Sequence, residues 1–201
     1  WRRDTNIRQV LQRERPSFVV LVMGRKDEIK YGELKRICTH ELGIGSQAML
    51  SKNVCGGRAG IIIPNIVRQI VCKIGYCPRI IPCPPCTRGA MVVGLDVCHK
   101  SKIGKSVVGM CATISSNFAR YLSAFSLQDQ GKEIVHNLRQ FIERALQVYR
   151  EENSAYPSQV VFLRDGVGDG QLDYVNGIEV PAVRGAMEAK CPGSKLMFVV
   201  V

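Results

Sequence analysis

Met91-Val92-Val93-Gly94-Leu95-Asp96 and Val160-Val161-Phe162-Leu163-Arg164-Asp165 are two apolar runs that each close on an aspartate. Each run is rich in β-branched residues and too short for a typical helix, so it predicts a strand buried on both faces. A carboxylate at the end of such a strand is costly unless it holds a cation or joins a hydrogen-bond network. If the two strands are neighbours, their aspartates would form a divalent-metal site of the kind that cleaves phosphodiesters.

The chain is short and strongly basic. Its 201 residues contain 28 Lys plus Arg against 17 Asp plus Glu, which gives a formal net charge of +11. This length allows one large domain or two small ones. The excess charge predicts a polyanionic partner, with nucleic acid ahead of an anionic membrane surface. No apolar stretch approaches the roughly 20 residues that a spanning helix needs, so we expect no membrane partner.

The first residues and the cysteines indicate the compartment in which the protein functions. The start, Trp1-Arg2-Arg3-Asp4, has no apolar core of a secretory leader behind its charges. A first residue other than Met indicates an excerpt from something longer. The nine cysteines are odd in number and form no disulfide framework, which predicts reduced thiols and an intracellular protein.

Residues 77–88 predict a linker between two domains, 1–76 and 89–201. Four prolines fall in this segment, a density that disfavours both a helix and a central strand. Cys83-Pro84-Pro85-Cys86 could instead be a redox pair or, with Cys77, part of a zinc site. Because there is no second CxxC and no histidine at ligand spacing, the linker interpretation is favoured.

The segment before the linker has an α/β pattern. Apolar periodicity, with Gly24 and Pro64 as boundary signals, predicts alternating helices and strands. The predicted helices are 6–13, 29–40 and 62–72, and the predicted strands are 18–23 and 47–50.

The segment after the linker predicts three strands, a long helix, and then strand, helix and strand. In the long helix, one stripe comprises Ile134, Leu138, Phe141, Ala145 and Val148. The order of elements is that of an RNase H-like domain. The predicted strands are 90–97, 107–115, 119–125, 159–164 and 195–201, and the predicted helices are 133–150 and 182–189.

Several stretches carry a resemblance to a known family. Arg164-Asp165-Gly166-Val167-Gly168-Asp169-Gly170-Gln171 resembles the RDGVGDGQ signature of the Piwi branch of the Argonaute family, whose related branch more often has Ser-Glu in place of Gly168-Asp169. Val93-Gly94-Leu95-Asp96-Val97-Cys98-His99 is similar to the family's first catalytic strand. Upstream, Tyr31–Arg36, Gln47 and Cys72–Gly75 resemble the guide-binding part of the MID domain.

The match runs in the right order along nearly the whole chain, so it is far more specific than any one motif. It implies an α/β architecture in which a Rossmann-like MID domain, residues 1–76, binds the guide 5′ end. An RNase H-like PIWI domain, residues 89–201, would follow the linker and be truncated at its C-terminal end.

The resemblance implies that Tyr31, Lys35, Gln47 and Lys73 bind the 5′ end of a guide RNA. Tyr31 and Lys35 are four apart on a predicted helix and share a face, where a ring can stack on a base and an ammonium can meet a phosphate. Spacing alone fits an ordinary solvated helix face as well; the family order favours guide binding. Gln69 stands where many family members have another phosphate-binding lysine, and we expect a Piwi-type pocket to tolerate it by recruiting a cation.

For the second domain the resemblance implies an Asp-Glu-Asp-His tetrad that holds two Mg²⁺ ions, with Mn²⁺ as an alternative. Asp96 and Asp165 match the two aspartates and would be metal ligands, and Glu133 matches the glutamate. Hard carboxylate oxygens suit Mg²⁺, which activates a water and stabilises the leaving oxygen. From the residues alone, Asp165 could be a turn former, Asp96 a strand-end cap and Glu133 a carboxylate at a helix N-terminus.

The expected histidine has no match in this chain. It should lie beyond the last strand, after Val201, and none of His40, His99 or His136 stands in its place. Lys100 also departs from the acidic or small residue common there. With three of four catalytic residues, enzymatic activity is left open.

Three hypotheses follow. The first is a Piwi-type slicer endoribonuclease that binds a small guide RNA and cleaves a complementary target RNA, in a pathway of the piRNA type. The second is a guide-binding silencing module without effective cleavage, and the third is another RNase H-like nuclease or transposase. Guide-end preference separates the third from the others, and divalent-dependent cleavage separates the first two. The resemblance implies cytoplasm or perinuclear granules, with the nucleus as an alternative.

Overall fold

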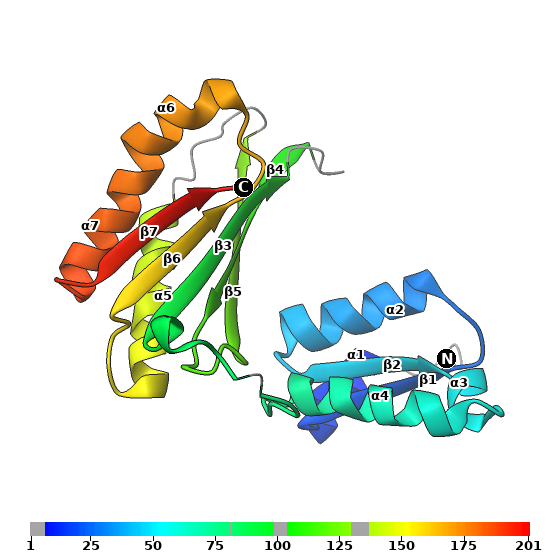
Figure 1. Ribbon diagram of the computed structural model, residues 1–201. Coiled ribbons are helices and arrows are strands. Elements are labelled where there is room, and N and C mark those ends of the chain that lie inside the picture. The colour runs from blue at the N-terminus through cyan, green and yellow to red at the C-terminus, as the bar shows by residue number, and fades with distance from the viewer. Residues whose placement is uncertain (1–6, 81, 99–103, 130–136) are drawn as a thin grey trace. The chain divides into compact units, whose positions relative to one another are not determined.

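The computed structural model describes residues 7–80, 82–98, 104–129 and 137–201. The chain divides into two compact units, Trp1–Arg79 and Ile80–Val201. The division between Arg79 and Ile80 falls inside the segment 77–88 for which the sequence predicts a linker. Both units are shown in Figure 1.

The first unit is a small α/β layer built on two parallel strands. Strand β1 pairs with strand β2 from Phe18↔Gly45 to Met23↔Leu50, and the connection between them is helical. Its elements are helix α1 (Ile7–Glu14), β1 (Phe18–Met23), helix α2 (Glu28–Lys35), a π-helical segment (Arg36–Glu41), β2 (Gly45–Leu50), helix α3 (Ser51–Cys55) and helix α4 (Ala59–Lys73).

Apolar side chains from α1, α2 and the π-helical segment form the core of this unit. Leu11, Leu34, Ile37 and Cys38 are buried, and Val19 and Leu21 of β1 pack against them. At the start of β2, a Cβ atom on Gly45 would lie 2.8 Å from Cδ2 of Phe18. A side chain there would displace the Phe18 ring, so glycine permits the close pairing of the two strands.

The second unit is a five-stranded mixed sheet with the order β5-β4-β3-β6-β7. Strands β3, β4 and β5 pair antiparallel, whereas β3, β6 and β7 run parallel (Figure 1). Its elements are a 3₁₀ turn (Pro85–Thr87), β3 (Ala90–Cys98), β4 (Lys105–Thr113), β5 (Tyr121–Asp129), helix α5 (Leu138–Asn153), β6 (Gln159–Arg164), a 3₁₀ turn (Asp169–Gln171), helix α6 (Leu172–Tyr174), a π-helical segment (Val175–Glu179), helix α7 (Val180–Lys190) and β7 (Lys195–Val200).

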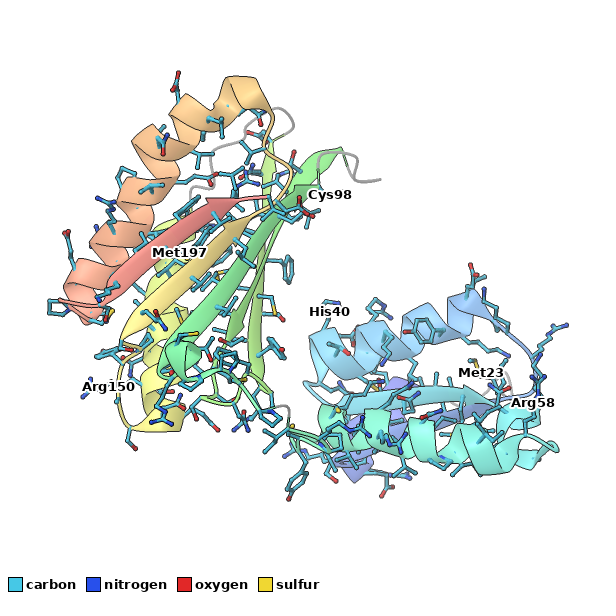
Figure 2. The ribbon with its side chains drawn as sticks, viewed as in Figure 1. Met23, His40, Arg58, Cys98, Arg150 and Met197 are labelled. Atoms are coloured by element: carbon cyan, nitrogen blue, oxygen red, sulfur yellow. The ribbon has the colours of Figure 1, made fainter. Side chains whose placement is uncertain are left out.

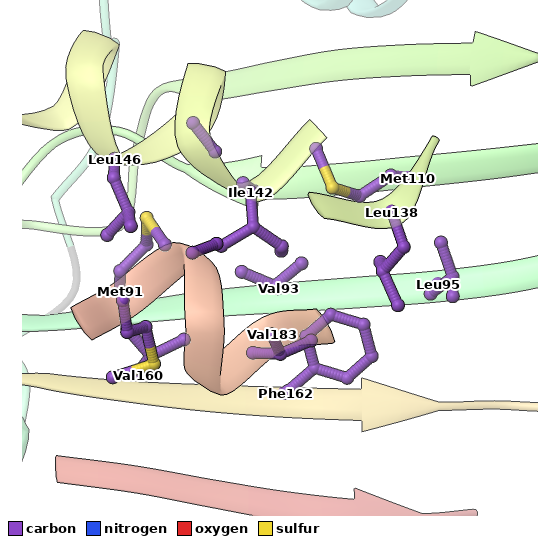
Figure 3. Close-up of a cluster of buried hydrophobic side chains, with 14 of the residues drawn as sticks. Met91, Val93, Leu95, Met110, Leu138, Ile142, Leu146, Val160, Phe162 and Val183 are labelled. Carbon is purple, nitrogen blue, oxygen red and sulfur yellow. The ribbon is translucent and has the colours of Figure 1, made fainter. Parts of the chain in front are cut away.

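Helices α5 and α7 bury one face of this sheet (Figure 3). Inward-facing Met91, Val93 and Leu95 of β3 are fully or almost fully buried, and they pack with Ile142 of α5 and Val183 of α7. Because side chains alternate along a strand, the residues between them point to the opposite face. The sheet therefore has one face sealed by helices and one face that the described helices leave open.

Several predicted elements were placed correctly and others were displaced. The strand predictions 18–23 and 159–164 match β1 and β6, but the predictions 107–115 and 119–125 differ from β4 and β5 by two to four residues at their ends. The short helix α3 was missed. Helix α7 was predicted, but the helical structure that precedes it, from Asp169 to Glu179, was missed because Gly170 and Gly177 there are signals of a break.

The long helix is described from Leu138 onward, so the predicted start at Glu133 lies outside the described residues. The predicted apolar stripe was partly wrong: Leu138 and Ala145 are buried, but Phe141 and Val148 are only half-buried. Their places in the core are taken by Ile142, Leu146 and Tyr149. The helix is therefore rotated so that its 3.6-residue period follows these residues. No described helix is long and apolar enough to cross a membrane.

Candidate functional site

Helix α2 presents the first predicted site residues. Its N-cap is Asp27, whose Oδ1 accepts a hydrogen bond from the Lys30 backbone N–H at 3.0 Å. This bond lowers the pKa of Asp27, with further help from the positive charge of Lys30. The cap fixes the start of the helix, and Tyr31 and Lys35 follow on one face because they are four residues apart.

Tyr31 and Lys35 lie against each other. The Lys35 Nζ atom is 5.9 Å from the centroid of the Tyr31 ring, which is within the range of a cation–π contact. Tyr31 is 47% exposed, although tyrosine is usually more buried. The ring therefore offers an open aromatic face next to a positive charge.

Two lysines converge on one backbone carbonyl. The Nζ of Lys35 donates to the carbonyl oxygen and to the hydroxyl of Ser46, each at 2.9 Å. The Nζ of Lys73, the last residue of α4, donates to the same carbonyl at 3.0 Å and to Oε1 of Gln47 at 2.6 Å. Desolvation and the charge of Lys35 both lower the pKa of Lys73. The structure thus brings Lys35, Gln47 and Lys73 together from α2, β2 and α4.

Gln47 is held by a second glutamine. Its Nε2 donates to the Ala48 carbonyl at 3.0 Å and to Oε1 of Gln69 at 3.1 Å. Gln69 lies one helical turn before Lys73 on α4. The residue that departs from the family pattern therefore orients one of the predicted site residues, a contact that the sequence did not reveal.

A pocket opens beside these lysines, with a volume of about 410 Å³. The described residues that line it include two cations and no carboxylate, so its electrostatic character suits an anion. Backbone and hydroxyl groups at the start of β2 add polar contacts. The lining residues are Lys35, Thr39, Gly43, Ile44, Gly45, Ser46 and Lys73.

The second unit brings two of the predicted catalytic residues together. Leu95 of β3 pairs with Arg164 of the parallel neighbour β6, and each is followed by an aspartate. Leu95 and Val97 of β3 and Arg164 of β6 are at inward positions, so by the alternation of side chains Asp96 and Asp165 are at positions of the open face. Both aspartates are exposed. Asp96 lies two residues before Cys98, which marks the end of β3 in Figure 2.

The turn after β6 brings the two aspartates close. Gly166 has a φ of +77°, and a Cβ atom on it would lie 3.5 Å from Oδ1 of Asp96. The same Oδ1 accepts a hydrogen bond from the Val97 backbone N–H at 2.7 Å. Neither Asp96 nor Asp165 forms an ion pair with any described residue. Within the part of the chain that the structure describes, no positively charged side chain occupies either carboxylate.

The donor set fits a divalent metal ion in part. Two exposed carboxylates on neighbouring strands are the oxygen ligands that Mg²⁺ and Mn²⁺ prefer. Within the described residues, however, no group of three or more His, Cys, Asp and Glu side chains is arranged to hold a metal. Glu133, the third predicted member, and His99 lie outside the described residues.

Sequence reasoning missed a buried ion pair beneath this site. Nε of Arg164 donates to Oε2 of Glu179 at 2.9 Å, and Nη2 donates to Oε1 at 3.3 Å. The Nη1 atom of Arg164 donates to the backbone carbonyl of Asp165 at 2.6 Å. Arg164 is 5% and Glu179 1% exposed. The signal was present in the sequence, since Arg164 is a charge at an inward position after Val160 and Phe162.

The chain matches a protein-family model over most of its length. The model of the Piwi domain covers residues 18–201. The Piwi-like protein Siwi of Bombyx mori is 31% identical over 196 residues, which are 96% of this chain and 22% of that protein. Protein argonaute-3 of Drosophila melanogaster is also 31% identical, over 82% of this chain and 19% of its own length. The chain thus spans about a fifth of the length of these relatives.

Solved structures share the fold. The MID-PIWI domains of the N. crassa QDE-2 AGO protein superpose with a TM-score of 0.81 at 24% identity, over 96% of this chain and 58% of that one. Drosophila Piwi gives a TM-score of 0.78 at 21% identity and is covered over 26% of its length. Kluyveromyces polysporus Argonaute, solved with a guide RNA, gives 0.79 at 21% identity, over 24% of its length. The mixed α/β architecture therefore matches that of MID and PIWI domains, and the chain belongs to the Argonaute/Piwi family.

Proposed function

We propose that the protein binds the 5′-phosphorylated end of a small guide RNA in its first unit and cleaves a paired target RNA with its second. The observation that carries the proposal is the convergence of Lys35 and Lys73 on the Ser46 carbonyl, next to an exposed tyrosine ring. Membership of the Argonaute/Piwi family supports it, because family homologues bind guide RNA. The same membership disfavours an unrelated nuclease or transposase.

In the first unit each residue has a distinct role. The ammonium groups of Lys35 and Lys73 would bind the terminal phosphate, and Gln47 would donate to it once its amide leaves Gln69. Tyr31 would stack on the first base. Without an anion, the two lysines share a carbonyl that neutralises neither of them, so a phosphate would relieve the charge repulsion between them.

In the second unit Asp96 and Asp165 would hold divalent metal, with Glu133 as the third carboxylate. Bound Mg²⁺, or Mn²⁺, would activate a water and stabilise the leaving oxygen of the phosphodiester. Asp96 and Asp165 would place the cation on the open face of the sheet, where the scissile phosphate would bind. The fourth residue of the tetrad, a histidine, has no match among residues 1–201.

Guide binding is tested by titrating the chain with short single-stranded RNA that carries either a 5′-phosphate or a 5′-hydroxyl, with and without Mg²⁺. We expect tighter binding of the phosphorylated RNA, and loss of this preference in Lys35→Ala and Lys73→Ala. Lys52→Ala is a matched control, because Lys52 is an exposed lysine on α3. Equal affinity for both RNA ends, with the same salt dependence, would leave only a basic surface and refute the proposal.

Cleavage is tested in the whole protein loaded with a guide. We expect divalent-dependent cutting of a complementary target that is lost in Asp165→Ala with guide binding intact. Phosphate-selective binding without cutting would favour a silencing module that acts without effective cleavage. We place the protein in a piRNA-type pathway on the strength of the Gly168-Asp169 pair of the Piwi-branch signature. The same assignment favours cytoplasm or perinuclear granules, and no membrane partner.

A further inference from the structure

The Arg164–Glu179 ion pair lies on the face of the sheet opposite to Asp165. Arg164 points inward, toward the helices, whereas Asp165 points to the open face. Glu179 ends the π-helical segment Val175–Glu179 and is the N-cap residue of α7. Its backbone angles are helical (φ −70°, ψ −46°), so it lies within continuous helical structure that leads into α7. The pair therefore joins the end of β6 to the start of a helix on the sealed face.

Stability alone does not account for this pair. Taking two charges out of water costs several kcal/mol per ion, and replacing a buried pair by apolar residues is often neutral or stabilising. Arg164 also uses its third nitrogen outside the pair, on the carbonyl of Asp165. A guanidinium forked on Glu179 is fixed in orientation, and so the direction of its Nη1 donor is fixed as well.

The backbone of Asp165 is held at both of its own polar groups. Its N–H donates to the Leu95 carbonyl at 3.0 Å, and its carbonyl accepts from Nη1 of Arg164 at 2.6 Å. The carbonyl that precedes it, on Arg164, accepts from the Val201 N–H at 2.9 Å. After Asp165 the chain enters the left-handed turn at Gly166. Among the described residues the Asp165 carboxylate has no ion pair, and the contacts that the structure shows for this residue are those of its backbone.

We infer that Arg164 and Glu179 are positioning residues, which fix the Asp165 carboxylate relative to Asp96 for divalent-metal binding and RNA cleavage. The inference rests on the proposed cleavage function. Glu179 orients the guanidinium of Arg164, which in turn holds the backbone carbonyl of Asp165. The Asp165 carboxylate is then directed to the open face of the sheet. π-helical segments often occur at functional sites, and here one brings Glu179 under the strand end.

The test compares four variants with the wild type by Mn²⁺ affinity, measured from the electron paramagnetic resonance signal of free Mn²⁺. The key variant is Arg164→Met with Glu179→Met, which removes both charges together and so leaves no unpaired buried ion. The second is Arg164→Lys, which keeps a cation for Glu179 but cannot fork on Glu179 and reach the Asp165 carbonyl at once. Asp165→Ala removes a proposed metal ligand and so tests whether Mn²⁺ binds at this site. Arg150→Met is the control for loss of an exposed arginine. Thermal unfolding monitors folding of each form.

We expect both pair variants to bind Mn²⁺ about 10–100-fold more weakly, as is usual when residues behind a metal ligand are lost. In the guide-loaded protein we expect the Mn²⁺ concentration for half-maximal cleavage to rise by a similar factor. If Asp165→Ala weakens Mn²⁺ binding but both pair variants bind as the wild type does, the pair is merely structural and the inference is wrong. If Asp165→Ala itself binds Mn²⁺ normally, the proposed metal site fails, and this inference fails with it.

Discussion

The side chains of Lys35 and Lys73 donate hydrogen bonds to the same acceptor, the Ser46 carbonyl oxygen, at 2.9 and 3.0 Å. A single carbonyl dipole therefore accepts hydrogen bonds from two ammonium groups, which come from α2 and α4. The charge of Lys35 contributes, after desolvation, to the lowered pKa of Lys73. The positive charge of the pocket therefore favours an anion.

The lowered pKa of Lys73 makes the stability of the first unit depend on pH. Between the folded-state pKa and the usual value of 10.5, the unfolded chain keeps a proton that the folded chain has lost. The free energy of unfolding should therefore rise with pH through this window, whereas below it the destabilising contribution is present in full. Urea unfolding at a series of alkaline pH values should show this rise in the wild type. Lys73→Met should remove it, and Lys52→Met should leave it unchanged.

Inorganic phosphate should stabilise the protein through the same lysines. A ligand that binds only the folded state at ten times its Kd adds about 1.4 kcal/mol to the free energy of unfolding. We expect phosphate to raise the melting temperature more than chloride at equal ionic strength, and to do so less in Lys35→Met and Lys73→Met. An equal response of all three proteins would mean that phosphate acts elsewhere on the basic surface.

Tyr31 should contribute to RNA affinity through its ring. Stacking of an aromatic side chain on a base is worth about 1–3 kcal/mol, so Tyr31→Ala should weaken binding of 5′-phosphorylated RNA by roughly 5–150-fold. Tyr31→Phe keeps the ring and should stay close to the wild type. Fluorescence anisotropy with labelled RNA measures the effect. If Tyr31→Phe loses as much as Tyr31→Ala, the hydroxyl rather than stacking is responsible.

The sequence predicted the strands best where local pattern and tertiary packing agree. Phe18–Met23 and Gln159–Arg164 are short β-branched runs with clear boundaries, and both predictions were confirmed. The π-helical segments Arg36–Glu41 and Val175–Glu179 were not predicted, because one extra residue in a helical turn leaves no distinct apolar period. The rotation of α5 was set by the sheet and by α7, which pack against it.

The sequence could predict which side chains belong to the candidate sites, but not the backbone groups and the partners that they contact. Tyr31, Lys35, Gln47 and Lys73 were named from the order of the motifs. The βαβ connection places Lys35 of α2 near Gln47 of β2, whereas Lys73 comes from α4, which packs on β2. The acceptor on which the lysines converge is a backbone carbonyl, which every residue possesses, so no sequence pattern could reveal Ser46. Arg164 was visible as a charge on the inward side of an apolar strand. Its partner Glu179 required the fold.

Substitution of Gly166 should lower both the stability of the protein and its affinity for Mn²⁺. Its φ of +77° lies in the left-handed region, where an L-residue costs roughly 1–2 kcal/mol. A Cβ atom would also stand at van der Waals distance, 3.5 Å, from Oδ1 of Asp96 and would occupy space beside that carboxylate. We expect Gly166→Ala to lower the free energy of unfolding by about this amount and to weaken Mn²⁺ binding. Gly170→Ala is the control, because a Cβ atom there meets nothing within 4 Å.

Asp96→Asn should separate stability from metal binding. Two exposed carboxylates on neighbouring strand ends repel each other, by up to about 1 kcal/mol at close range in water. Without divalent ions, Asp96→Asn should therefore unfold at an equal or slightly higher urea concentration than the wild type. On addition of Mg²⁺ the wild type should gain about 1.4 kcal/mol at ten times its Kd, and Asp96→Asn little or nothing. Asp173→Asn, on helix α6, is the control for removing a carboxylate elsewhere. A Mg²⁺ response in Asp96→Asn equal to that of the wild type would show that the ion binds without Asp96, and the two aspartates would then be turn and strand-end residues only.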